Sequence, residues 1–422
     1  MKKKLLFFVL LTALLLTACL LTASCGEGEG EKIVLYVYNW GEYIEDGSGT
    51  EDGVGVNELF EEYCREELGL NVEVNYSTFS SNEDMYAKID SGAVAYDVII
   101  PSDYMIERMV KEKLIRPLDL SKIPNYKNID DRFKGENVYY ETDAAEGEHY
   151  SVPYFYGMIG VIYNSSIVAE DDTDLGSWSL MWDADYRGDI LQFNNNRDAF
   201  GTALYYLGYD VNEATDEQWR EALELLKKQK DVVQGYVMDE IFNKMKSGSA
   251  AVAAYYAGDF LSMYEDNEDL AFFYPKEGTN VFVDAMCIPA SSQNPEIAER
   301  YIDFMLSEEA AIANAEYICY ASPNKLVAQN ADYRAAMEEI HPDAIDILYG
   351  TEELDLQFYE NLPSDQLMLL NDLWEDLKIE SSVSTSIIVM ASVIVCGGAA
   401  AGVFFYVRNR RRRRFVDGLW SE

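Results

Sequence analysis

Residues 96–104 read YDVIIPSDY, and this stretch gives the strongest indication of the fold. Its β-branched centre is typical of a buried strand, and a helix is expected directly after it, over Ser102–Lys111. Residues 36–43, YVYNWGEY, repeat the plan: a strand-like run ends in aromatic and acidic residues. Ligands of open α/β sheets bind beyond the carboxyl ends of the strands, so both stretches mark a candidate binding cleft.

Strands and helices alternate through the body of the chain, from Glu31 to about Glu380. Strand-like runs over Ile33–Tyr38 and Asn71–Tyr76 flank an amphipathic helix, and a second helix is expected over Asn82–Ser91. This short β-α-β spacing predicts a mostly parallel sheet with right-handed crossovers.

A second lobe is expected after the polar, loop-like segment Asp119–Tyr150. Extended strands begin at Ser151, helices and strands alternate after them, and strand character resumes over Val281–Pro289. A chain that leaves one α/β lobe, builds another and returns suits a two-lobed clamshell with its ligand between the lobes.

The composition excludes several classes of protein. A net charge of −42 on 422 residues would repel nucleic acid, and most of these carboxylates are expected to form a solvated surface. No Cys-x-x-Cys pair occurs, and His149 and His341 stand alone, so no metal site is expected.

The N-terminus is expected to be a lipoprotein signal peptide over residues 1–25. Three lysines precede an apolar run that begins at Leu5. Lipobox-like sequences end at both Cys19 and Cys25, and the acidic tether that follows Cys25 favours that residue for lipidation without deciding between them.

The C-terminus contains a second membrane signal. Residues 387–407 include no charged side chain and are long enough to cross a bilayer as a helix. Six arginines lie within residues 408–414, which places that end in the cytoplasm and the acidic body outside the cell membrane.

The remaining cysteines are Cys64, Cys287 and Cys319, since Cys396 falls in the predicted membrane helix. Cys64 lies on the apolar face of its helix and is expected to be a buried thiol. Cys287 and Cys319 could pair outside the cell, but an odd count of three argues for free thiols.

The expected organisation follows from these segments. It comprises a signal peptide 1–25, a tether 26–32, the first part of lobe 1 over 33–152, lobe 2 over 153–275, a return to lobe 1 over 276–322, C-terminal helices packing on the lobes over 323–380, a transmembrane helix 387–407 and a basic cytoplasmic tail 408–422.

Aromatic faces and carboxylates that converge on one cleft are suited to a small organic cation. Trp40 and Tyr43 flank Glu42 after a strand, which is not how a core is usually built. Both opening stretches resemble ligand-binding segments of the spermidine/putrescine-binding proteins of polyamine ABC transporters. Residues 82–88 (NEDMYAK), 182–188 (WDADYRG), 274–278 (YPKEG) and 320–324 (YASPN) extend the resemblance, which covers the chain from about Ile33 to Lys378.

The resemblance implies a type II periplasmic-binding-protein-like clamshell and a set of ligand-binding residues. These are Trp40, Glu42, Tyr43, Ser102, Tyr104, Asp198, Tyr256, Asp259, Asp284 and Tyr320, with Gly41, Asp103, Asn195 and Phe282 as further candidates. Asn195 replaces an acid that the family often has, and Tyr256 and Phe282 stand where Trp is common. The Tyr256 variant resembles the putrescine-preferring branch.

The resemblance implies an extracytoplasmic, membrane-anchored receptor that delivers a polyamine to the permease and ATPase subunits of an ABC transporter. It implies no cofactor, and the chain has no GxSxG phrase or phosphate-binding glycine loop, so an enzyme is not expected. The alternatives are a binding protein for another small solute and a membrane-tethered solute sensor.

Overall fold

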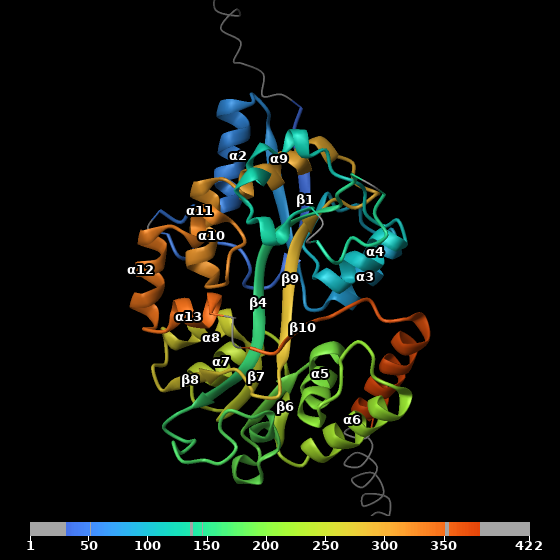
Figure 1. Ribbon diagram of the computed structural model, residues 1–422. Helices are drawn as coiled ribbons and strands as arrows, with labels where there is room; N and C mark the ends of the chain where they lie inside the picture. The colour runs from blue at the N-terminus through green and yellow to red at the C-terminus, as the bar shows by residue number, and fades with distance from the viewer. Residues whose placement is uncertain (1–30, 51, 136–137, 146, 351–353, 380–422) are drawn as a thin grey trace, which may run out of the picture.

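The computed structural model describes residues 31–50, 52–135, 138–145, 147–350 and 354–379 (Figure 1). Within these ranges, no helix combines the length and the apolar character needed to cross a membrane. The predicted signal peptide, both candidate lipidation sites, the predicted span 387–407 and the basic tail lie outside the described residues.

The described strands join into one ten-stranded sheet that passes through both halves of the molecule. Its order is β2-β1-β3-β9-β4-β7-β5-β6, with β10 beside β9 and β8 beside β4. The strands are β1 (Ile33–Trp40), β2 (Val72–Phe79), β3 (Val98–Ile99), β4 (Ser151–Asn164), β5 (Ile190–Phe193), β6 (Val233–Val237), β7 (Val252–Tyr256), β8 (Leu270–Phe273), β9 (Thr279–Cys287) and β10 (Leu356–Phe358).

The parallel arrangement expected near the N-terminus is present. Strand β1 runs parallel to β2, with Ile33 opposite Val72 and Trp40 opposite Phe79, and it also runs parallel to β3. In the other half, β5 is parallel to both β6 and β7. Because β1, β3, β5 and β7 are buried by helices on their faces, their apolar runs fill the cores of the two halves.

Helices cover the sheet in both halves (Figure 1). They are α2 (Val56–Glu67), α3 (Asn82–Asp90), α4 (Asp103–Lys111), α5 (Asn196–Leu207), α6 (Asp216–Gln229), α7 (Glu240–Lys246), α8 (Ala257–Tyr264), α9 (Pro295–Met305), α10 (Glu308–Ile318), α11 (Lys325–Ala328), α12 (Ala331–Ile340) and α13 (Ala344–Tyr349). A last helix over 364–379 lies against the half that contains α6.

Two long strands, β4 and β9, run side by side from one half to the other (Figure 1). They pair antiparallel from Ser151 opposite Cys287 to Met158 opposite Val281, with an irregularity between Pro153 and Phe155. Beyond this stretch, β4 pairs with β7 and β8 of the second half. The predicted two-lobed α/β fold is therefore confirmed, and these strands connect its lobes.

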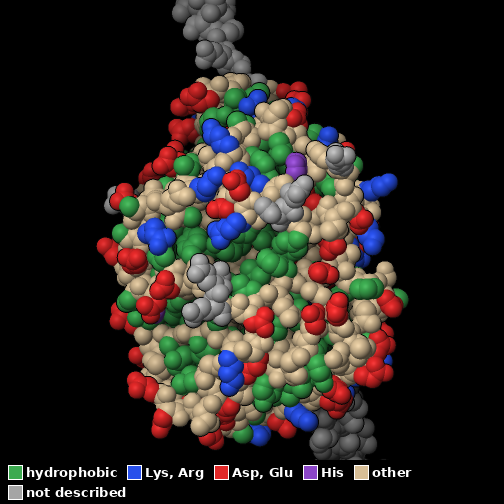
Figure 2. Space-filling view, viewed as in Figure 1, with side chains coloured by type: hydrophobic (Ala, Val, Ile, Leu, Met, Phe, Trp, Pro, Cys, Tyr) green, Lys and Arg blue, Asp and Glu red, His purple; other side chains and the backbone are tan. Residues whose placement is uncertain are grey.

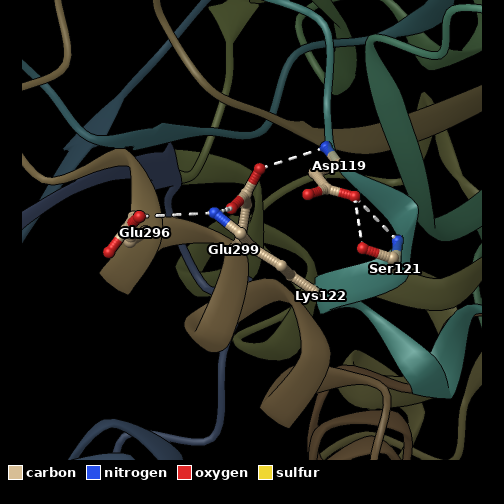
Figure 3. Close-up of polar contacts among 5 residues, drawn as sticks. All are labelled: Asp119, Ser121, Lys122, Glu296 and Glu299. Carbon is tan, nitrogen blue, oxygen red and sulfur yellow. Dashed lines mark hydrogen bonds and ion pairs between the residues drawn. The ribbon is translucent and has the colours of Figure 1, made fainter.

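The polar segment after α4 contains short 3₁₀ turns, Leu120–Lys122, Pro124–Asn128 and Asp131–Phe133, rather than α-helices or strands in its described part. Figure 3 shows how its first turn is held to α9. Glu299 accepts a hydrogen bond from the Asp119 N–H at 3.0 Å and pairs with Lys122 at 3.2 Å. The loop is thus fixed to lobe 1 by a charged group that is itself mostly buried.

The acidic composition of the chain is visible on its surface. Asp and Glu side chains spread over the face in Figure 2, whereas Lys and Arg gather in its upper half around a central apolar area.

Cys64, Cys287 and Cys319 are buried and free, so Cys287 and Cys319 do not form a disulfide.

Candidate functional site

A cavity with a free volume of about 80 Å³ lies where the two lobes meet. That volume holds several water molecules or a short chain of atoms. Residues of both lobes line it, and they include every predicted ligand-binding residue except Asp103: Trp40, Gly41, Glu42, Tyr43, Ser102, Tyr104, Asn195, Asp198, Tyr256, Asp259, Phe282, Asp284 and Tyr320.

The loop after β1 supplies the first part of the wall. Glu42 adopts a left-handed conformation, with φ of 49°, which is uncommon for a residue with a side chain. The next residue, Tyr43, is buried, and its carbonyl accepts a hydrogen bond from Asn39 Nδ2 at 3.0 Å. This turn brings the Glu42 carboxylate and the Tyr43 ring to the cavity together.

Asp284 lies on β9, on the strand face that also presents Asn280 and Phe282, because side chains two apart point the same way. Its carboxylate accepts hydrogen bonds from Ser102 Oγ at 2.6 Å and from Tyr43 Oη at 2.9 Å. Burial raises the pKa of Asp284 to about 7 despite these two donors. The carboxylate is therefore held in place, and no cation among the described residues pairs with it.

Asp198 occupies the first turn of α5 in lobe 2. Its Oδ2 accepts hydrogen bonds from Tyr256 Oη and from Asn195 Nδ2, both at 2.7 Å. Asn195 also caps the helix, since its Oδ1 accepts from the Asp198 N–H at 2.8 Å. Burial raises the pKa of Asp198.

Asp259 is a third carboxylate of the cavity wall, half-buried at the start of α8. Burial raises its pKa to about 8, and the negative charges of Asp239 and Glu42 raise it further. Lobe 1 comes very close here: a Cβ on Gly41 would lie 2.5 Å from Asp239 Oδ2. Carboxylates of both lobes thus converge on one end of the cavity.

Aromatic rings fill the space between the carboxylates. The Tyr43 and Tyr320 rings meet edge to face at 5.2 Å between centroids, and Tyr256 meets Phe282 at 5.3 Å. Trp40 packs on Phe79 at 4.5 Å beside the entrance. Such walls can pack methylene groups and attract cations through the ring faces.

A larger cleft of about 1670 Å³ shares Glu42, Glu83, Asp239 and Asp259 with the cavity wall. Its own walls add further carboxylates, Glu45, Asp84, Glu240, Glu265, Asp266, Glu316 and Glu375, against the cations Lys246 and Lys378. Such an acidic cleft raises the local concentration of cations.

The sequence profile of one protein family, described as "bacterial extracellular solute-binding protein", matches residues 58–339. The chain belongs to this family. The match includes Ser102, Asp198, Asp259 and Asp284, whereas Trp40, Glu42 and Tyr43 of the cavity wall precede it.

Known solute-binding relatives agree with the assignment. The "spermidine/putrescine-binding periplasmic protein" of Salmonella typhimurium is 31% identical over 324 residues, covering 76% of this chain and 87% of that protein. The "putrescine/cadaverine-binding protein" of Pseudomonas aeruginosa is 28% identical, covering 82% and 93%. A solved structure, a "putative spermidine/putrescine ABC transporter from Listeria monocytogenes", superposes with a TM-score of 0.70 at 33% identity, covering 82% and 99%.

Asp103, a further candidate from the sequence of this solute-binding protein, is not among the residues that line the cavity. Its side chain is fully buried and accepts hydrogen bonds from the Val283 N–H at 3.0 Å and from the Tyr139 hydroxyl. Burial raises its pKa to about 7. Its other oxygen, Oδ1, accepts from the Tyr104 N–H at 2.7 Å, so Asp103 links the start of α4 to β9.

Several wall residues escaped the sequence analysis. Asn82 orients two predicted residues, since its Nδ2 donates to Ser102 Oγ and to Tyr104 Oη, each at 3.1 Å. Its position in the quoted stretch 82–88 could have indicated this role. Glu83 stands in the same stretch. The remaining wall residues carry no local pattern that separates them from ordinary surface or core residues: Phe79, Ser80, Ser81, Arg197, Met238, Asp239, Phe242, Tyr255, Asn280 and Tyr359.

Outside the cavity, one group of three carboxylates is close-set enough to hold a metal ion. Asp172, Asp174 and Asp183 bring carboxylate oxygens within 4.8 Å of one another on the surface of lobe 2. Tyr186 donates to Asp172 and Ser179 donates to Asp174, so the hydroxyls of the chain already use these carboxylates.

Proposed function

We propose that this protein captures a polyamine, putrescine or spermidine, between its lobes and delivers it to an ABC transporter permease. One observation supports this most directly: Asp198 and Asp284, both buried, and the half-buried Asp259 line one aromatic-walled cavity, and desolvation raises the pKa of each. Desolvated carboxylates of this kind gain most from a ligand that brings its own positive charges.

The chemistry of a polyamine matches the cavity part by part. Its ammonium groups would pair with the carboxylates, and its methylenes would pack against Trp40, Tyr43, Phe282 and Tyr320. The names of the relatives, which bind spermidine, putrescine or cadaverine, support the same class of ligand. The proposed role includes no step that forms or breaks a covalent bond, so we propose a binding protein and not an enzyme.

We further propose that β4 and β9 act as the hinge between the two lobes. Lobe 1 comprises residues 33–152 and 276–322, and lobe 2 comprises residues 153–275. Lobe 1 meets lobe 2 closely at Gly41 and Asp239, and the negative charges of Glu42 from lobe 1 and Asp239 from lobe 2 both act on Asp259. A bound polyamine would neutralise them and favour closure, a ligand-driven change in population between two states.

We also propose that the receptor works at the outer face of the cell membrane. Lipidation at Cys25 or Cys19 and a spanning helix over 387–407 would provide two tethers, which raise the receptor's effective concentration beside its permease. The relatives' periplasmic assignment supports the extracytoplasmic side.

Thermal unfolding tests the proposed ligand class. A ligand that binds only the folded state adds about 2.7 kcal/mol of stability at a hundredfold excess over its dissociation constant. We expect putrescine or spermidine to raise the melting temperature clearly and butanol, which lacks the charges, to leave it unchanged. A rise with a sugar or ferric iron and none with either polyamine would refute the proposal.

A further inference from the structure

The last helix of the described chain, over 364–379, joins the body to the proposed span at 387–407. Only residues 380–386 separate the two, and the eight peptide units from one to the other reach at most about 28 Å. The part of the body that carries this helix therefore lies close to the membrane surface. Its position on the body decides which face of the protein is turned toward the membrane.

The last helix is held on lobe 2 along its length, beside α6 (Figure 1). Near its start, Gln366 Nε2 donates to Asp216 Oδ1 at 2.9 Å, and near its end the Leu377 carbonyl accepts from Lys230 Nζ. These two partners mark the first residue and the C-cap of α6, so the two helices run side by side. The apolar side chains of the last helix are buried against the lobe: Leu370, Leu373, Trp374 and Leu377. Their burial makes the helix a fixed part of lobe 2.

One side of the same helix belongs to the rim of the larger cleft between the lobes. Asn371, Trp374, Glu375 and Lys378 line that cleft. Asn371 Oδ1 also accepts a hydrogen bond from Asn196 Nδ2 of α5 at 2.8 Å. The Lys378 ammonium lies 4.5 Å from the centre of the Trp374 ring, so the final turn still lies on the cleft wall. The described chain therefore ends at the rim of the cleft and not at the hinge strands.

The other proposed tether does not fix a direction in this way. It leads into β1, where the Ile33 N–H donates to the Asn71 carbonyl at 2.8 Å. The strand then runs for eight residues, about 26 Å, before Trp40 reaches the cavity. A lipid anchor there holds lobe 1 by its outer end and leaves the direction of the cleft open. The direction is therefore set by the last helix.

We propose that the last helix is an orienting tether, which turns the rim of the larger cleft toward the membrane and the permease. The inference rests on the proposed span and the proposed delivery to a permease, and it adds the surface at which the two proteins meet. That surface is the rim of both lobes, with Asp84 on lobe 1 and Glu240 on lobe 2. Because the rim is rich in carboxylates, it is complementary to a basic protein surface. The groove with Arg132 and Phe358, beside the hinge strand β9, is turned away from the partner.

Energy transfer to the membrane surface tests this orientation in the full-length protein. The protein is reconstituted in phosphatidylcholine vesicles whose headgroups carry an acceptor dye, and a donor is attached to one introduced cysteine. Asp84→Cys and Glu240→Cys place the donor at exposed positions on the rim, and Arg132→Cys places it at an exposed position beside the hinge. Protein without an introduced cysteine gives the background. We expect transfer from both rim positions to exceed that from Arg132→Cys about twofold or more, because the tether holds the rim within its own length of the membrane.

A flexible linker removes the orientation without changing either lobe. About thirty Gly and Ser residues inserted between Ser382 and Val383 let the body turn on its tether. We expect the rim and hinge positions to show equal transfer in this variant, whereas polyamine affinity stays as in wild type.

The possible results separate the inference from the proposals on which it rests. Equal transfer from all positions without the linker, or stronger transfer from Arg132→Cys, would overturn the inference. A rim preference that survives the linker would also overturn it, since the rim itself would then bind lipid. Full-length protein that does not remain with the vesicles would refute the proposed span, and the inference with it. Absence of polyamine binding would instead refute the proposed function and leave the measured orientation standing.

Discussion

At the scale of single residues, the site combines carboxylates that are fixed in position with aromatic rings that keep water away. Asp284 illustrates the arrangement, since Ser102 and Tyr43 orient both of its oxygens while burial keeps its pKa near 7. Such a group is poised to hold a cation because its orientation does not have to be established on binding.

Asp284→Asn should therefore be among the most damaging single changes for polyamine binding. The variant leaves a ligand ammonium buried without its counter-charge, which costs roughly 2–5 kcal/mol, or about 30-fold to several thousand-fold in affinity. Titration calorimetry measures the loss, with the exposed Asp231→Asn as control. Equal affinities for wild type and Asp284→Asn would contradict the assigned role.

The raised pKa values also predict how stability depends on pH. The folded-state pKa of Asp259 is about 8 and that of Asp284 about 7, whereas an unfolded Asp titrates near 3.9. Because the folded-state pKa values are raised, proton binding to these two carboxyls stabilises the folded state fully below about pH 4. This contribution to the free energy of unfolding is lost as the pH rises toward 8, at no more than about 1.4 kcal/mol per pH unit for each group.

Chemical unfolding of the ligand-free protein from pH 5 to pH 8 checks this. We expect the free energy of unfolding to decline less steeply in the double variant Asp259→Asn, Asp284→Asn than in wild type. Identical pH dependence of the two proteins would show that burial does not raise the pKa of these carboxyls.

At the scale of elements, the strand ends and the helix starts that match the family resemblance, such as those with Asp198 and Asp259, were predictable parts of the site, whereas residues placed there by strand pairing were not. The stretches 36–43 and 96–104 are recognisable in the sequence because polar and aromatic residues follow a buried strand within a few positions. Asn280 and Tyr359, by contrast, reach the cavity only through the pairing of β9 with β4 and β10. Arg197 resembles any arginine near a helix start until its burial is known. Asp103 lies outside the cavity wall although it follows Ser102 directly, because sequence alone does not tell which side of a helix start faces the core.

Helix α8 offers a test of how closely the elements must approach. An added methyl group at Gly258 would overlap the Tyr320 ring, which forms part of the cavity wall. Gly258→Ala should therefore displace this ring and weaken polyamine binding by roughly tenfold, the order expected for a misplaced aromatic contact. Gly235→Ala on β6, where a Cβ meets no atom within 4 Å, is the control. Unchanged affinity in Gly258→Ala would show that Tyr320 does not shape the site.

At the scale of the whole molecule, the fold was predictable from the alternation of strands and helices together with the resemblance. The two crossing strands place Asp284 on β9 beside Ser102 of lobe 1, while Asp198 and Asp259 come from lobe 2. Ligand binding and lobe closure are consequently one event in the proposed mechanism, since a polyamine that touches all three carboxylates must bridge the lobes.

The proposed topology makes a separate prediction at this scale. With the body outside and the arginine-rich tail inside, a cysteine at Ser421 should resist a membrane-impermeant thiol reagent in intact cells. One at the exposed Ser48 should react. The native Cys64, Cys287 and Cys319 are buried and provide a low background. Labelling at both positions from outside would overturn the proposed span.

The central claim, that buried carboxylates of both lobes capture a polyamine, is tested most directly by calorimetric titration in two buffers of different ionisation enthalpy at pH 7. The account predicts one ligand per chain with release of protons, because a bound cation lowers the raised pKa values of Asp259 and Asp284. Absence of putrescine and spermidine binding, or binding without any proton release, would contradict it.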